Sequence, residues 1–160
     1  MENCFHLQKS FLSGYGGFHL RCFFLAYHGI SNNLELFPER APATVSSFID
    51  LINKGFYNQK YFHRVVPNFV IQTGCPRGDG YGSLDFTIRS EVADSYYDAE
   101  GYVGMASAGP HTEGTQFFIT HSPTPHLDGK YTIFGRVISG MEVVHRIAMG
   151  DQIKTINILY

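Results

Sequence analysis

The chain has 160 residues, a length that favours one domain with a core that needs no disulfide or metal to hold it. Its 12 Lys and Arg against 14 Asp and Glu leave a formal charge of −2, which argues against the basic surface of a nucleic-acid-binding protein. The 14 Phe, 10 Tyr and 17 Gly indicate a turn-rich, mainly β domain.

The first 19 residues match no element that can be assigned, and the domain is expected to span 20–160. The apolar runs before residue 30 are interrupted by Gly, His and Arg, so they are too short to cross a membrane and make a poor signal peptide. Cys4, Cys22 and Cys75 form no paired motif, which favours a reducing compartment. We expect a cytoplasmic protein without a membrane partner. The alternative is a periplasmic or exported protein with a degenerate or truncated signal. The chain could also be a fragment of a longer protein.

In chain order, 20–27 and 34–37 are expected to form a hairpin, although Ser31, Asn32 and Asn33 leave an incomplete first strand as an open alternative. A helix is then expected from Ala43. Apolar residues recur there at i, i+3, i+4 and i+7, and Gly55 supplies the stop. The stripe consists of Val45, Phe48, Ile49 and Ile52.

A second hairpin is expected to join 61–66 to 69–73 through a Pro67-Asn68 turn. Short strands are expected to follow, with a second helix ending before Gly150 and a terminal strand over 153–159. The strands are 86–88, 101–105, 115–120 and 131–137, and the helix is built on Met141, Val144, Ile147 and Ala148. This pattern predicts a closed eight-stranded antiparallel barrel with two capping α-helices.

Five blocks carry a family resemblance when they are considered together. They are Phe62-His63-Arg64-Val65-Val66-Pro67-Asn68-Phe69-Val70-Ile71-Gln72, Gly104-Met105-Ala106-Ser107-Ala108-Gly109-Pro110, Thr115-Gln116-Phe117-Phe118-Ile119-Thr120, Leu127-Asp128-Gly129-Lys130 and Phe134-Gly135. In this order and spacing the chain resembles the cyclophilins from about Leu34 to Leu159.

The resemblance implies a barrel with a proline pocket on its outer face and peptidyl-prolyl cis/trans isomerase activity on X-Pro bonds, without cofactor or covalent intermediate. It implies as partners proline-containing peptides and unfolded proteins whose folding is assisted, and a monomer. Arg64 matches the catalytic arginine. Phe69, Val70, Phe118, Leu127 and Tyr131 match pocket positions, and Gln72, Ala106, Ser107, Ala108 and Gln116 match peptide-contacting positions.

The chemistry of Arg64 agrees with that role. Rotation about a peptide bond faces a barrier of roughly 18–20 kcal/mol because of amide resonance. The twisted prolyl nitrogen regains a lone pair, which a permanently charged guanidinium can hydrogen-bond. One such donor supplies about 3–4 kcal/mol, so orientation in an apolar pocket must supply the rest.

Because successive side chains of a strand point to opposite faces, Gln116 and Phe118 should share one face, and so should Val70 and Gln72. The same alternation places Phe69 on the face opposite to Val70. A twist or bulge after the turn is needed to bring Phe69 to the pocket.

The chain departs from the family at the pocket rim, where His126 stands in place of a common tryptophan. We therefore expect weak cyclosporin binding. Ser107, Val70 and Tyr131 replace a common asparagine, methionine and histidine, in the manner of bacterial members, and the apolar volume of the pocket is largely kept.

Other functions fit less well. The run from Gly78 to Gly82 has no Gly-Lys-Ser/Thr motif, so a flexible turn is favoured over a phosphate loop. The eight histidines show no ligand spacing, so no metal site is expected. A non-enzymatic peptide-binding module is the main alternative, and a scaffold protein is a third. Retention of Arg64, Phe69 and Gln72 favours an enzyme.

Overall fold

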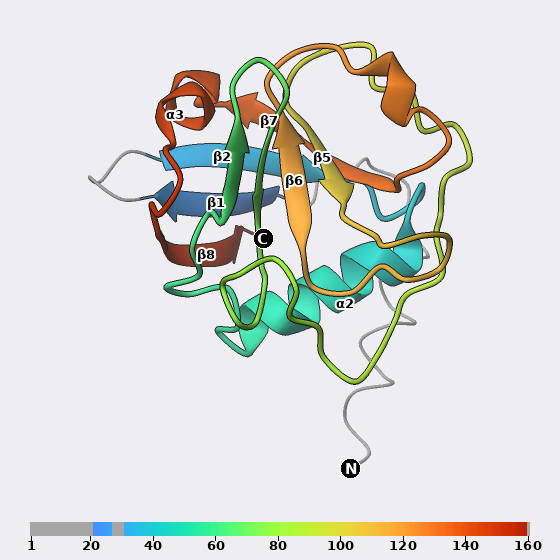
Figure 1. The fold of residues 1–160 in the computed structure, drawn as a ribbon, viewed down its shortest axis with the longest axis horizontal. Helices are drawn as coiled ribbons and strands as arrows, with labels where there is room; N and C mark the ends of the chain where they lie inside the picture. The colour runs from blue at the N-terminus through green and yellow to red at the C-terminus, as the bar shows by residue number, and fades with distance from the viewer. Residues whose placement is uncertain (1–20, 27–30, 160) are drawn as a thin grey trace.

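The computed structural model describes residues 21–26 and 31–159, and its backbone is mainly β with two α-helices. Eight strands form one sheet in the order β3-β4-β6-β5-β7-β2-β1-β8, and every neighbouring pair is antiparallel. The strands are β1 (Arg21–Ala26), β2 (Ser31–Leu36), β3 (Arg64–Val66), β4 (Val70–Thr73), β5 (Tyr102–Met105), β6 (Phe117–Thr120), β7 (Ile133–Ser139) and β8 (Ile153–Leu159). Helices α2 (Pro42–Asn53) and α3 (Met141–Arg146) lie at opposite ends of the strands (Figure 1).

In the described residues Ser31, Asn32 and Asn33 do not interrupt the sheet, contrary to the alternative that they would leave its first hairpin incomplete. These three residues belong to β2, which pairs with β1 on one side and β7 on the other. β1 itself pairs with both β2 and β8. All three residues are paired with β1, and Asn33 is also paired with Ser139 of β7. This pairing holds the backbone extended, and the β-propensity of the side chains is a weak determinant beside it. The expectations for 1–19 and for Cys4 lie outside the described residues.

One expected strand is absent, and the second helix ends earlier than expected. The segment 86–88 forms no strand and pairs only through an isolated bridge between Ile88 and Glu113. Helix α3 stops at Arg146, because the Asp151 carboxylate accepts a hydrogen bond from the Ala148 N–H at 2.9 Å and the Phe62 carbonyl accepts one from the Gly150 N–H at 3.0 Å. These bonds compete with continuation of the helix.

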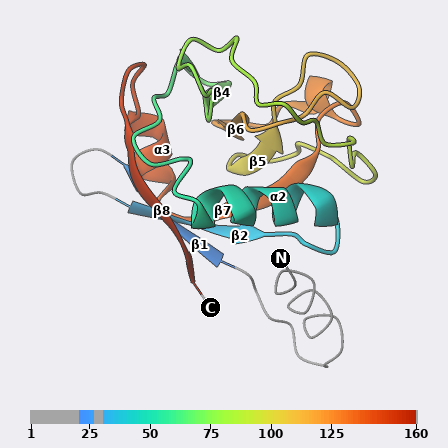
Figure 2. The same cartoon turned by 90° about the horizontal axis from the view of Figure 1, so that it is seen from below.

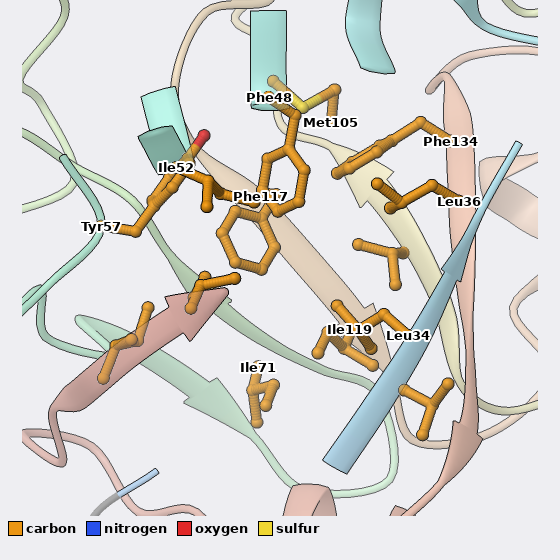
Figure 3. Close-up of a cluster of buried hydrophobic side chains, with 14 of the residues drawn as sticks. Leu34, Leu36, Phe48, Ile52, Tyr57, Ile71, Met105, Phe117, Ile119 and Phe134 are labelled. Carbon is orange, nitrogen blue, oxygen red and sulfur yellow. The ribbon is translucent and has the colours of Figure 1, made fainter. Parts of the chain in front are cut away.

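The interior is filled by one face of the sheet and the buried stripe of α2 (Figures 2 and 3). Cross-strand partners on this face are Val65, Ile71, Ile119, Val103 and Gly135, one from each of five neighbouring strands. Above them pack the aromatic rings of Phe48, Tyr57, Phe117 and Phe134, with ring centroids 4.9–6.4 Å apart. This interior fixes the strand register, and therefore determines which residues face outward.

Helix α2 begins without a side-chain cap of its own, and Pro42 occupies its first turn. Glu91, from a distant loop, accepts hydrogen bonds from the Ala43 and Thr44 N–H groups at 3.1 and 3.0 Å and from the Thr44 hydroxyl at 2.8 Å. A carboxylate is favourable at this positive end of the helix. The cap ties α2 to the segment that leads toward Glu113.

Candidate active site

A row of cross-strand partners on the outer face of the sheet forms the base of the site. Arg64 of β3 lies opposite Gln72 of β4, Gln72 opposite Phe118 of β6, and Phe118 opposite Gly104 of β5. Residues directly opposite one another in antiparallel strands share a face. The sheet therefore brings a cation, an amide and an aromatic ring side by side from segments far apart in the chain.

These residues line a pocket of about 290 Å³. Nine of the predicted site residues form its wall, namely Arg64, Phe69, Val70, Gln72, Ala106, Ser107, Phe118, Leu127 and Tyr131. Two others do not line it. Gln116 lies behind Gln72 and accepts a hydrogen bond from it at 3.0 Å, and the Ala108 N–H donates to the Thr112 hydroxyl at 2.9 Å.

The pocket floor is a hydrophobic cluster separate from the interior core. Val70, Tyr97, Phe118, Leu127 and Ile133 are buried in it, and half-buried Phe69, Ala106 and Tyr131 pack against it. A cavity lined by such side chains suits an apolar ring rather than a polar ligand.

Phe69 reaches the pocket from the turn, not from the strand. Asn68 has a φ of 60°, and the Phe69 N–H bonds to the Val66 carbonyl at 3.0 Å, which closes the hairpin turn. β4 begins only at Val70, so strand alternation does not govern Phe69. The expected twist or bulge is thus supplied by the turn itself.

The Arg64 guanidinium is positioned by an aromatic ring. Its central carbon lies 5.6 Å from the centroid of Phe69, and the Arg64 residue is exposed at the pocket edge. Within the described residues, no hydrogen bond or ion pair engages this guanidinium. Its donors are therefore available to a ligand, and the stacked geometry restrains where they point.

His126 lies at the rim, beside Phe69. Its ring is 5.2 Å from the Phe69 ring and inclined by 30°, and it is carried by the short 3₁₀ turn Pro125–Leu127. The Lys130 ammonium donates to the His126 carbonyl at 2.9 Å. An imidazole thus covers the flank of Phe69 where a tryptophan would present a larger ring.

Tyr97 was missed by sequence reasoning, because it lies in the irregular segment 93–100. It is fully buried behind the pocket, its ring 5.8 Å from that of Phe118, and its hydroxyl donates to the Tyr131 carbonyl at 3.2 Å. Burial raises the pKa of the Tyr97 phenol, so the phenol remains a neutral donor. A buried tyrosine within an irregular loop carries no periodic signal that would have revealed it.

Three findings on metal sites, membrane spans and cysteines apply to the described residues. No group of three or more His, Cys, Asp or Glu could hold a metal ion. No helix is long and apolar enough to cross a bilayer. Cys75 is a free, buried thiol.

The family follows from comparison with known proteins. Residues 30–159 match the model described as "Cyclophilin type peptidyl-prolyl cis-trans isomerase/CLD". The chain belongs to the cyclophilin family. As a member, it is a peptidyl-prolyl cis-trans isomerase, as the five sequence blocks predicted.

Curated relatives support the assignment. The chain is 45% identical over 137 residues to peptidyl-prolyl cis-trans isomerase B of Bacillus subtilis, covering 85% of this chain and 96% of the relative. It is 46% identical over 123 residues to peptidyl-prolyl cis-trans isomerase-like 1 of Aspergillus oryzae, covering 74% of this chain and 76% of the relative.

Solved structures share the cyclophilin fold. A cyclophilin-type isomerase from Cryptosporidium parvum superimposes with a TM-score of 0.83 at 31% identity, covering 89% of this chain and 99% of that one. A second structure of that protein, crystallised in the presence of the dipeptide Ala-Pro, gives a TM-score of 0.81 at 31% identity over 88% of this chain and 99% of that one.

Proposed function

We propose that Arg64 is the catalytic hydrogen-bond donor of this isomerase and that the adjoining apolar pocket holds the proline ring of the substrate. The observation that carries this proposal is the Arg64 guanidinium over Phe69 at the mouth of the pocket, with which no side chain or carbonyl of the described residues forms a hydrogen bond or ion pair. A proline seated against Phe118 and Leu127 would place its amide nitrogen and carbonyl within the range of that donor.

The mechanism requires no covalent step. As the X-Pro bond twists, resonance is lost and the prolyl nitrogen gains a lone pair, so a hydrogen bond from Arg64 strengthens toward the transition state. Ala106, Ser107 and Gln72 hold the flanking peptide while the bond rotates. The pocket restrains the proline ring, so rotation is confined to the part of the substrate that precedes it.

The substrates are proposed to be X-Pro bonds in flexible or unfolded chains, whose folding the enzyme assists. Arg64 lies at the exposed mouth of the pocket, and a proline buried in a folded protein could not reach it. Phe69, Val70, Phe118, Leu127 and Tyr131 are the proposed proline contacts. Gln72 contacts the peptide directly, and Gln116 acts through it.

The test replaces Arg64 with Ala and with Lys and measures X-Pro exchange by NMR, together with peptide binding. One preorganised charged donor contributes about 2.7–4 kcal/mol to a transition state, so Arg64→Ala should lower kcat/KM roughly 10²- to 10³-fold. Arg64→Lys keeps the charge but loses the planar fork, and should recover only part of the rate. Arg146→Ala, at an exposed arginine of α3, is the matched control. Unchanged exchange with peptide still bound would favour the binding-module hypothesis.

We infer further that the sheet closes into a barrel between the segment preceding β3 and the start of β8. An antiparallel bridge joins Tyr61 to Gln152, and the Phe62 and Ile153 N–H groups bond to the Asp151 and Lys60 carbonyls at 2.9 Å each. Amide hydrogen exchange at Phe62 and Ile153 should then be as slow as in the central strands. Rapid exchange at both would indicate an open edge.

A further inference from the structure

A short loop after β4 folds around the sulfur of Cys75. This residue is 1% exposed, and its Sγ accepts hydrogen bonds from the backbone N–H groups of Gly80 at 3.2 Å and Gly82 at 3.3 Å. The thiol itself lies 3.6 Å from Asp79 Oδ1, which can accept its proton. One buried atom thus organises three residues of the loop.

The rest of the loop is built to keep this shape. Asp79 accepts a bond from the Tyr81 N–H at 2.9 Å and from Arg77 at 2.5 Å, and these contacts lower the pKa of the Asp79 carboxyl, chiefly through the Tyr81 bond. Gly80 has a φ of +87°. A Cβ at Gly82 would lie 2.9 Å from the Arg77 backbone nitrogen. Neither glycine position therefore accepts a larger residue without displacement.

The two glycines also turn their carbonyls toward the side chain of Gln116. Gln116 Nε2 donates to the Gly80 and Gly82 carbonyls at 2.9 and 3.0 Å. A carbonyl can only accept, so the amide of Gln116 must present its nitrogen to the loop and its oxygen away from it. The orientation of this amide is thereby fixed by the loop rather than left open.

The orientation of the Gln116 amide determines the orientation of the Gln72 amide in the pocket wall. Gln116 Oε1 accepts from Gln72 Nε2 at 3.0 Å, so the nitrogen of Gln72 is engaged within the protein. In the described part of the chain no donor engages Gln72 Oε1, and Gln72 lines the pocket. Of the two polar atoms of the Gln72 amide, the oxygen is therefore the one that a bound peptide can engage.

We propose that Cys75 is a positioning residue, which acts through the loop, Gln116 and Gln72 to present Gln72 Oε1 as an acceptor for a backbone N–H of the bound peptide. The proposal rests on the proposed function, because it concerns how that same pocket positions the backbone of the bound peptide. It predicts that substrates must offer an N–H at this wall. A peptide N-methylated at the contacting residue should bind more weakly.

The experiment compares Cys75→Ala, Cys75→Ser and Gln116→Leu with the wild type. The first readout is the set of side-chain amide NMR signals of Gln72 and Gln116, and the second is the separation of KM from kcat on a short X-Pro peptide. Val144→Ala, at a fully buried position of α3, controls for loss of stability. Cys75→Ala should shift both amide signals and raise KM by about three- to tenfold with kcat nearly unchanged. This is the effect expected when one hydrogen bond between Gln72 and the bound peptide is weakened.

Cys75→Ser keeps an acceptor and should fall between the wild type and Cys75→Ala. The double variant Cys75→Ala/Gln116→Leu should raise KM no further than Gln116→Leu alone, because both changes interrupt one chain of contacts. Amide signals that superimpose on those of the wild type, or KM effects that multiply, would overturn the proposal. The amide signals do not depend on turnover, so an unchanged rate in Arg64→Ala would refute the catalytic assignment without deciding this one.

Discussion

The guanidinium of Arg64 and the ring of Phe69 are stacked at the mouth of the pocket, 5.6 Å apart from carbon to centroid. The two residues come from opposite sides of one hairpin turn. Phe69 also contacts the apolar floor, so it connects the proposed donor to the proposed proline site.

Phe69→Leu should reduce kcat/KM by more than the loss of side-chain volume in the pocket would by itself. Leucine retains an apolar surface but offers no π face to the guanidinium, an interaction worth about 0.5–1 kcal/mol at exposed sites. With the loss of ring contact to the proline, we expect about a tenfold lower kcat/KM. Phe86→Leu, at an exposed phenylalanine outside the pocket wall, should leave the rate unchanged. Equal rates for wild type and Phe69→Leu would contradict the stacking argument.

Local signals predicted most of the fold. The terminal strand has the expected bounds, Ile153–Leu159, and the α2 helix begins one residue before the expected Ala43. Both follow from short-range periodicity and stop signals. The Pro67-Asn68 turn was predicted correctly for the same reason, because one proline and one residue that tolerates positive φ suffice to define it.

The elements that were wrong depend on partners distant in sequence. Asn32 and Asn33 look like turn residues, yet pairing with β1, and for Asn33 also with β7, holds them in a strand. Ile147 looks helical, yet the backbone beyond it is engaged by Asp151 and Phe62. Neither constraint can be inferred from a window of neighbouring residues.

The site was predictable only in part. The resemblance selected Arg64, Gln72 and Phe118, but their alignment depends on the register of three strands, which alternation alone does not give. The glycine run before Ser83 predicted no more than a flexible turn. Its hydrogen bonds to Cys75 and Gln116 depend on the fold and leave no motif in the sequence.

His126→Trp should increase sensitivity to cyclosporin. The wild-type rim carries only an imidazole beside Phe69, so we expect inhibition to need drug well above the enzyme concentration. An indole there adds a larger apolar face, and a gain of about tenfold in affinity corresponds to about 1.4 kcal/mol. The chain has no other tryptophan, so binding can be followed by the fluorescence of the new one. Tyr96→Trp, at an exposed residue outside the pocket, supplies the control. Stoichiometric inhibition of the wild type would disprove the expectation.

Gly104→Ala should distort the pocket floor. A Cβ at this position would lie 2.3 Å from the Tyr97 hydroxyl and 2.4 Å from Phe118 Cζ, so at least one ring must move. Overpacking of this kind costs about 1–3 kcal/mol of unfolding free energy. Displacement of Phe118 should also raise KM. Gly114→Ala is the matched control, because the nearest atom to its Cβ is the Phe86 carbonyl oxygen at 3.9 Å. Urea unfolding and kinetics would test both effects, and two glycine variants of equal stability and KM would refute the prediction.

Glu113→Gln should remove a pH dependence of stability. The Glu113 carboxyl is fully buried, and its oxygens accept from the Thr132 hydroxyl at 2.9 and 3.0 Å. Burial raises its pKa above the ordinary value, and the Thr132 bonds offset this only in part. The folded state thus keeps a proton that the unfolded state has lost, so stability is greatest below the unfolded pKa and falls as pH rises through the folded pKa.

Unfolding free energy of the wild type should therefore decrease from pH 4.5 upward with a slope of at most about 1.4 kcal/mol per pH unit from this group. Glutamine keeps an acceptor for Thr132 without a charge, so the advantage of Glu113→Gln over the wild type should grow with pH until the carboxyl is ionised. Glu39→Gln, at an exposed carboxylate, should run parallel to the wild type. Urea titrations at several pH values would decide, and a constant difference between Glu113→Gln and the wild type would show that the buried carboxyl titrates alike in both states.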